Sequence, residues 1–185
     1  MNSMIRKWLF LLVIVALVLL LDQVTKQLVI THLRLGETFR PIPALTPFFQ
    51  ITRSENTGAA FGFLTQSSDL FLVIALVVVA IMLVYYPRLP EGVWLTRFAM
   101  GLVVGGALGN AFDRVSHGAV IDFIHYQIPG IVSNVSNLAD HAIVLGVLII
   151  VAQSWRSDVA KDRAALPEAT DPESESEKPT SDSRG

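Results

Sequence analysis

Two aspartates draw attention because each lies in an apolar stretch of sequence. Asp122 is the centre of Val-Ile-Asp-Phe-Ile, and Asp140 comes just before the apolar run 142–155. Two carboxylates brought close together cannot both ionise easily, so they share a proton and provide one acid and one base. Such a pair can activate water against a peptide bond. Taken singly, Asp122 could equally be an ion-pair partner of Arg114 or Lys26, and Asp140 could compensate a helix dipole.

Asp22, Lys26, Asp113 and Arg114 are further ionisable residues at the ends of apolar runs. A charged group at membrane depth is costly and by default marks a functional site. Asp22 and Lys26 are spaced to share one helix face, so a self-neutralising pair is favoured over direct chemistry. Arg114 could hold a substrate carbonyl or phosphate, or it could neutralise Asp113, and the sequence leaves both roles open.

The apolar run 98–112, which is followed by Asp113 and Arg114, contains several small residues. Gly101, Gly105 and Gly109 are spaced four apart, which lets helix backbones approach closely, so we assign them to packing. Asn110 in the same run could donate hydrogen bonds to neighbouring helices or loops.

Other chemistries find less support in the sequence. The chain has no cysteine, no H-E-x-x-H, no G-x-S-x-G and no Walker loop, and His117, His125 and His141 lack zinc-site spacing. We therefore expect no metal, no cofactor and no nucleic-acid partner.

The composition is that of a membrane protein. Of 185 residues, 52% are hydrophobic and only 16% are charged, whereas soluble domains carry about 25% charged residues. The uncharged runs are 8–21, 70–86, 98–112 and 142–155. A membrane-spanning helix needs about 20 residues, so most runs must continue past a polar residue. We predict an all-α integral membrane protein, a four-transmembrane-helix bundle with a small β-rich element on its outer surface. A soluble helical core is disfavoured because too little polar surface remains.

The helix ends follow from the same requirement. The first helix should extend through Asp22 to about residue 30, and the third should reach about Asp113 or begin before Arg97. The fourth should begin near Leu138. The first run could be mistaken for a signal peptide. It ends in Leu-Leu-Leu-Asp-Gln, which is not the small-residue site at which signal peptides are cleaved, so we interpret this run as a retained span. Lys and Arg near the span ends are more numerous on the side of the termini, which predicts both termini in the cytoplasm.

The segments between the predicted spans differ in character. In the first outer segment, 31–68, prolines at 41, 43 and 47 break any helix, and 48–53 is predicted to be a short strand. Residues 56–63 are typical of a turn followed by an apolar loop. The second outer segment covers about 114–137.

The composition changes near residue 157. Residues 157–185 contain eight acids and four bases with no large apolar residue after Leu166, which is typical of disorder. We predict two parts, a four-span membrane domain at 1–156 and an acidic, disordered cytoplasmic tail at 157–185. The total charge of −2 conceals a body of +2 and a tail of −4.

Five short motifs follow one another along the chain. They are Asp22-Gln-Val-Thr-Lys26, Asn56-Thr-Gly-Ala-Ala-Phe-Gly62, Gly105-Gly-Ala-Leu-Gly-Asn110-Ala-Phe-Asp113-Arg114, Val120-Ile-Asp122-Phe and Asn137-Leu-Ala-Asp140. In their order and spacing they resemble the motifs of the bacterial lipoprotein signal peptidases, signal peptidase II. The resemblance covers about residues 5–155.

The resemblance implies an intramembrane aspartyl endopeptidase of the bacterial inner membrane, without a cofactor. It would cleave prolipoproteins on the N-terminal side of the diacylglyceryl-modified cysteine, with its active site on the periplasmic side. It implies that Asp122 and Asp140 are the catalytic pair and that a small β-cradle lies over the membrane surface. The substrate site would be shaped by Asn56, Gly58, Asn110, Asp113, Arg114 and Asn137, and supported by Asp22 and Lys26. Expected partners are prolipoproteins and membrane lipids, and we expect a monomer.

One departure from the family pattern is visible. Members usually carry Phe where this chain has Ser136, and the preceding loop at 127–135 is long. Both features affect the expected geometry beside Asp140.

A small transporter and an assembly factor are the alternative functions. A transporter would carry ionisable groups at more than one depth, but they gather at the outer ends of the spans.

Overall fold

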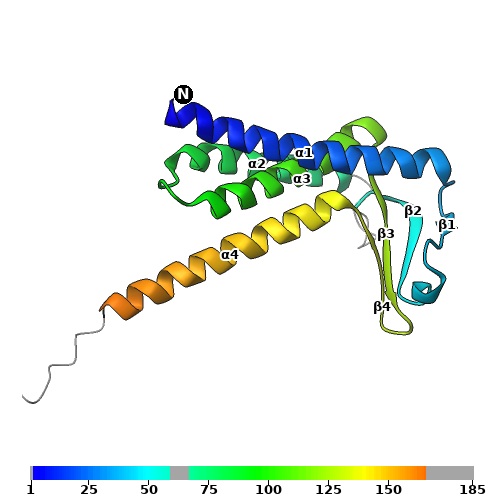
Figure 1. The fold of residues 1–185 in the computed structure, drawn as a ribbon. Coiled ribbons are helices and arrows are strands. Elements are labelled where there is room, and N and C mark those ends of the chain that lie inside the picture. The colour runs from blue at the N-terminus through cyan, green and yellow to red at the C-terminus, as the bar shows by residue number, and fades with distance from the viewer. Residues whose placement is uncertain (1, 59–66, 166–185) are drawn as a thin grey trace, which may run out of the picture. The chain divides into compact units, whose positions relative to one another are not determined.

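The computed structural model describes residues 2–58 and 67–165 of the chain. In this part, helices α1 (Ser3–His32), α2 (Ser67–Tyr85), α3 (Trp94–His117) and α4 (Leu138–Ala165) are long and apolar (Figure 1). Each of them has the length and composition to cross a membrane. The predicted continuations are confirmed, because α1 passes through Asp22, α3 includes both Arg97 and Asp113, and α4 begins at Leu138. The chain divides into units Met1–Val151 and Ala152–Gly185.

Helix α3 is the central helix of the first unit. Most of its residues are buried, and it packs against α1 and α2. A Cβ at Gly101 would lie 2.7 Å from Cγ2 of Ile14, and one at Gly105 would lie 2.8 Å from Cβ of Val18. Gly106 meets the Ala139 carbonyl of α4 in the same way. The packing role predicted for these glycines is confirmed, because only glycine permits such close helix contacts.

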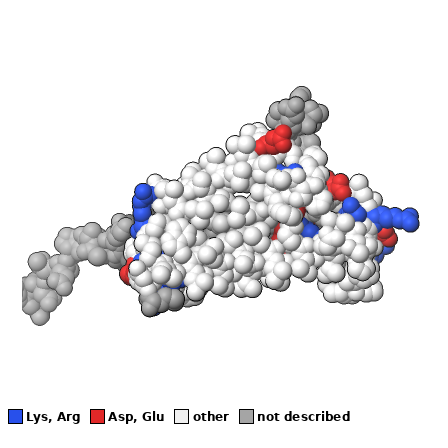
Figure 2. Space-filling model, turned by 90° about the horizontal axis from the view of Figure 1, so that it is seen from above, with Lys and Arg blue, Asp and Glu red and all other residues white. Residues whose placement is uncertain are grey.

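The outer faces of the helices carry large apolar side chains. On α1 these include Leu12, Leu17, Leu20 and Leu28, all exposed. Figure 2 shows that the middle of the visible face is free of charged residues, which gather toward the ends. Such a surface is compatible with lipid and not with water, so the chain is a multi-pass membrane protein.

A four-stranded antiparallel sheet lies at one end of the helices (Figure 1). Its order is β1 (Thr38–Phe39), β2 (Phe49–Asn56), β3 (Val120–Ile128) and β4 (Val132–Ser136). A 3₁₀ helix, η1 (Pro43–Leu45), follows β1. The predicted strand at 48–53 lies almost wholly within β2, and the predicted turn at 56–63 is outside the described residues from 59 onward.

The segment 127–135 is not a loop. It forms the ends of β3 and β4, with Ile128 paired to Val132 across a tight turn at Pro129 and Gly130. The chain is therefore mostly helical and not all-α. The predicted small β-rich element is a four-stranded sheet, of which the sequence analysis located one strand, at 48–53. Pro-Gly between β-branched residues is a turn signal that could have identified this hairpin.

The opposite end of the bundle is closed by a short connection between α2 and α3. It contains the 3₁₀ helix η2 (Tyr86–Arg88). The buried guanidinium of Arg97 donates to the carbonyls of Tyr86, Leu89 and Pro90. Arg97 thereby supplies side-chain donors to the backbone oxygens of this turn.

Candidate active site

Strand β2 has an irregularity before the residues that face Asp122. The register between β2 and β3 shifts between Ile51 and Ser54, and Ser54 then pairs with Asp122. A bulge of this kind re-aims the side chains that follow it in β2, and Asn56 is one of them. The buried Asp122 accepts hydrogen bonds from Asn137 Nδ2 at 2.7 Å and from Asn56 Nδ2 at 3.0 Å. Amides thus occupy both oxygens, in place of the cationic partners considered from the sequence.

Asp140 lies in the first turn of α4, beside Asn137. Asn137 directly precedes the helix, and its Oδ1 accepts from the Asp140 backbone N–H at 2.9 Å, which is helix N-capping. Asp140 Oδ1 accepts from Asn110 Nδ2 at 2.7 Å. Asn137 therefore contacts both aspartates, through its amide nitrogen to Asp122 and through its oxygen to Asp140.

Asn110 of α3 joins the aspartates to the rest of the bundle. Its Nδ2 donates to Asp140, while its Oδ1 accepts from Asn137 Nδ2 at 3.2 Å and from Lys26 Nζ at 3.1 Å. Such a network fixes each amide in one orientation, since every member has a defined donor or acceptor.

Lys26 forms the predicted pair with Asp22, and Asp113 joins this pair to make a buried ion triad. Its Nζ lies 2.8 Å from Asp22 Oδ2 and 2.7 Å from Asp113 Oδ2, and all three side chains are buried. The two carboxylates also accept backbone N–H groups, Asp22 from Ala139 at 3.0 Å and Asp113 from Ile121 at 3.1 Å. Ala139 and Ile121 directly precede Asp140 and Asp122, so the triad fixes the backbone beside each aspartate.

Gln23 is a site residue that the sequence analysis missed. Its Nε2 donates to Asp113 Oδ1 at 2.9 Å and to Asp22 Oδ2 at 3.2 Å. A polar residue next to Asp22 inside an apolar helix was the available signal, because an amide in a membrane helix needs a partner.

Arg114 lies at the edge of this network. Its Nη1 donates to the Asn110 carbonyl at 3.3 Å, and its guanidinium lies 5.5 Å from the centre of the Phe71 ring. Among the described residues no group pairs with its buried Nε. Asp113, the partner considered for it, is paired with Lys26.

Gly58 orients Asn56. The Gly58 N–H donates to Asn56 Oδ1 at 2.8 Å, and the positive φ of 80° at Gly58 is one that glycine adopts without strain. This Asx turn leaves Asn56 Nδ2 free to face Asp122.

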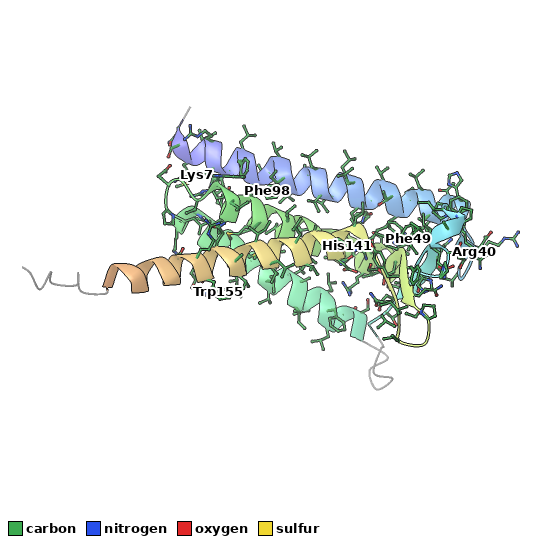
Figure 3. All side chains as sticks on the ribbon, turned by 60° about the horizontal axis from the view of Figure 1, so that its bottom comes forward. Lys7, Arg40, Phe49, Phe98, His141 and Trp155 are labelled. Carbon is green, nitrogen blue, oxygen red and sulfur yellow. The ribbon has the colours of Figure 1, made fainter. Side chains whose placement is uncertain are left out.

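A groove of about 630 Å³ opens beside Asp140. Its polar end includes Asn56, Asp140 and His141, while Val144 and Leu148 of α4 form an apolar wall. Figure 3 shows His141 and Phe49 on neighbouring elements at this end of the bundle. The groove therefore joins the lipid-facing side of α4 to Asp140, and its polar end includes Asn56, the partner of Asp122.

The surroundings of Asp122 favour its protonated form. Burial raises the pKa of Asp122 to about 6, the negative charge of Asp140 adds to this rise, and the hydrogen bonds from Asn56 and Asn137 oppose it. A carboxyl with this pKa can hold a proton near neutral pH, as a general acid must.

Fold and site together define a multi-pass membrane protein with two linked aspartates at the sheet end of its bundle. A family model described as signal peptidase (SPase) II matches residues 14–156. The chain belongs to this family.

Relatives of known name agree with this assignment. The lipoprotein signal peptidase of Halothermothrix orenii is 36% identical over 150 residues, covering 81% of this chain and 98% of that protein. The lipoprotein signal peptidase of Geobacillus kaustophilus is 41% identical over 137 residues, covering 74% and 87%.

Solved structures share the fold. A bacterial membrane enzyme determined at 1.9 Å resolution matches with a TM-score of 0.70 and 32% identity, covering 77% of this chain and 90% of that one. A second bacterial membrane enzyme matches with a TM-score of 0.71 and 28% identity, covering 87% and 94%.

Proposed function

We propose that Asp122 and Asp140 are the catalytic pair with which this chain cleaves prolipoproteins. As a member of the signal peptidase II family, the chain is an aspartic endopeptidase that removes signal peptides from prolipoproteins. The observation that carries the proposal is the Asn137 side chain, which holds Asp122 and Asp140 at once.

In the proposed mechanism the two aspartates have different roles. Asp122 acts as the acid, a role that its raised pKa of about 6 favours over that of an ordinary aspartate, and Asp140 acts as the base beside the groove. Asp140 takes a proton from water as the water oxygen attacks the peptide carbonyl carbon, and Asp122 gives its proton to the carbonyl oxygen. The C–N bond of the resulting tetrahedral intermediate then breaks. The leaving nitrogen receives the proton from Asp140, and Asp122 takes back a proton from one hydroxyl group of the intermediate, which leaves a carboxylic acid.

Neighbouring residues position the reactants in this proposal. Asn56, Gly58, Asn110, Asp113, Arg114 and Asn137 shape the substrate site, and Asp22 and Lys26 support it. Hydrogen bonds from Asn56 to Asp122 and from Asn110 to Asp140 support the role in the substrate site. The buried ion pairs of Lys26 with Asp22 and Asp113 support the structural role of Asp22 and Lys26. The unpaired Nε of Arg114 is a donor for a substrate carbonyl. Holding reacting groups in place lowers a barrier by several kcal/mol.

The proposed substrate is a diacylglyceryl-modified prolipoprotein, cut on the N-terminal side of its lipidated cysteine. Its acyl chains stay in the bilayer, and the apolar wall of the groove, with Val144 and Leu148, supports an approach from that side. We place the chain in the bacterial inner membrane as a monomer, with both termini cytoplasmic and the sheet at the periplasmic surface.

This function can be tested with purified enzyme and one precursor, prepared with and without its diacylglyceryl group. The lipidated precursor should be cleaved before its cysteine, and the unlipidated one much more slowly, because it lacks the group that holds it in the bilayer. Equal cleavage of the two, or cleavage elsewhere, would contradict the proposed specificity. Gel mobility and the N-terminus of the product are the measurements.

The pH dependence of cleavage tests the assignment of the proton. Ionisation of Asp122 removes the general acid, so kcat/KM should fall as pH rises above about 6. Asn56→Ala removes a hydrogen bond to the charged form of Asp122, so the pKa should rise and the descending limb should move to higher pH. Gln50→Ala, a change in the same strand away from Asp122, should leave the limb in place. A limb unmoved by Asn56→Ala would reject this assignment.

The division into a peptidase domain at 1–156 and a tail at 157–185 is also a proposal. Its support is the acidic, polar composition of the tail. Deletion of residues 167–185 should leave kcat/KM for the lipidated precursor within a few-fold of the full chain. A large loss would show that the tail takes part in catalysis or substrate binding.

A further inference from the structure

The hairpin of β3 and β4 has two unlike faces. Side chains alternate along a strand, so Ile124, Tyr126 and Ile128 lie on the face of β3 that carries Asp122. The register places Asn134 opposite Tyr126 and Val132 opposite Ile128. Because Asp122 points to Asn137 at the start of α4, this face is the one turned toward the membrane helices.

The reverse face is polar and internally bonded. His125 Nδ1 lies 3.0 Å from Thr52 Oγ1, and His125 Nε2 lies 2.9 Å from Ser133 Oγ. Gln50, paired with His125 in register, contacts the same imidazole at 3.1 Å. Such a face is suited to water, since its polar groups can also exchange hydrogen bonds with solvent.

The tip of the hairpin is unusually apolar for an exposed turn. Ile131 is 77% exposed, Ile128 51% and Val132 50%. No Asp, Glu, Lys or Arg occurs between Asp122 and Asp140 in the sequence. An exposed apolar patch without charge marks a surface that meets another apolar phase.

The apolar phase next to this tip is the bilayer. Val144, Leu145 and Leu148 are exposed on α4, a membrane-spanning helix, and they line the same groove as Tyr126. The lipid-facing surface of α4 therefore continues onto the apolar face of the hairpin. Figure 1 shows the strands crossing the helix axes steeply, so the hairpin extends sideways from the bundle.

We propose that the hairpin tip at 128–132 inserts into the bilayer leaflet on the side of Asp122 and anchors the sheet there. Side chains of Ile128, Ile131 and Val132 enter the acyl region, and the face with His125 and Ser133 stays in water. Asp122 lies on the same strand as Ile128, so the anchor fixes the depth of this aspartate relative to the membrane surface. The anchor does not depend on the peptidase assignment.

The absence of cysteine from the chain gives a direct experiment. Ile131→Cys and Ser133→Cys each create one labelling site, on the apolar tip and on the polar face. The full chain, labelled with an environment-sensitive fluorophore, is placed in nanodiscs of phosphatidylethanolamine and phosphatidylglycerol. The label at 131 should emit further to the blue, and spin-labelled lipids should quench it several-fold more than the label at 133. Aqueous iodide should quench the two in the opposite order.

Two results would overturn the proposal. One is equal quenching by iodide and by spin-labelled lipid at both positions. The other is a blue shift at 131 that disappears when one chain per nanodisc is enforced, since the tip would then contact a second copy. Val132→Cys is a second position on the apolar face and should repeat the result of Ile131→Cys. Retained cleavage of the lipidated precursor confirms that each labelled protein is folded.

Discussion

Asp122→Asn and Asp140→Asn should each reduce kcat/KM for a lipidated precursor by about 10²–10⁴-fold, the range by which a positioned acid or base accelerates a reaction. The amide at 122 holds no acidic proton for the carbonyl oxygen, and the amide at 140 cannot accept a proton from water. Both substitutions keep the size of the side chain and one acceptor oxygen, so Asn137 and Asn110 retain a hydrogen-bond partner. Cleavage by purified, monodisperse protein is the measurement.

Asp69→Asn is the matched control for these variants. Asp69 is an exposed aspartate in the first turn of α2, so its amide variant should cleave like the parent. Thermal unfolding in detergent should show that the 122 and 140 variants remain folded. Near-normal turnover by either folded variant would remove that aspartate from the catalytic pair.

The helices could be predicted because a membrane span leaves a strong mark in sequence. Three of the four uncharged runs had to be extended, past Asp22, Arg97 or Asp140, to reach a spanning length, and the helices extend as required. Such extension is informative, since a charged residue within a span must find a partner inside the bundle. The same reasoning identified the residues that now form the network.

Most of the sheet could not be predicted from sequence. β1 is a strand only because Thr38 and Phe39 pair with β2, and β3 is buried where it meets α3, so its inner half lacks the alternation of a surface strand. Long-range pairing decides both strands. The shift of register in β2, which precedes the Asp122 partner Asn56, depends on the same pairing and leaves no mark in the local sequence.

The partners within the site were also decided by tertiary contacts. Spacing on one helix predicted that Lys26 pairs with Asp22, which is confirmed, but Asp113 lies on another helix and joins only after packing. Asn137 illustrates the same limit. Its position before an apolar helix indicates a cap, while its second contact, to Asp122, requires that β3 and α4 meet.

Lys26→Met should lower the free energy of unfolding by about 3–5 kcal/mol, as expected when one partner of a buried ion pair is removed. Methionine fills a similar volume but leaves the carboxylates of Asp22 and Asp113 buried without their cation. Neutralising them, in Lys26→Met with Asp22→Asn and Asp113→Asn, should restore much of the loss, because the uncompensated charge is its main cause. Denaturant unfolding in one detergent measures all of these variants.

Lys7→Met is the matched control, since Lys7 lies on the same helix and its partner Glu91 is largely exposed to solvent. Water and salt screen such a pair, so its loss should change unfolding little. If Lys26→Met proved as stable as Lys7→Met, the buried triad would not hold the bundle together. The Ala139 and Ile121 backbone contacts would then have to position the aspartates without it. If instead Lys26→Met is destabilised and the neutral triple variant recovers stability but not cleavage, the charge of Lys26 serves the active site as well as the fold.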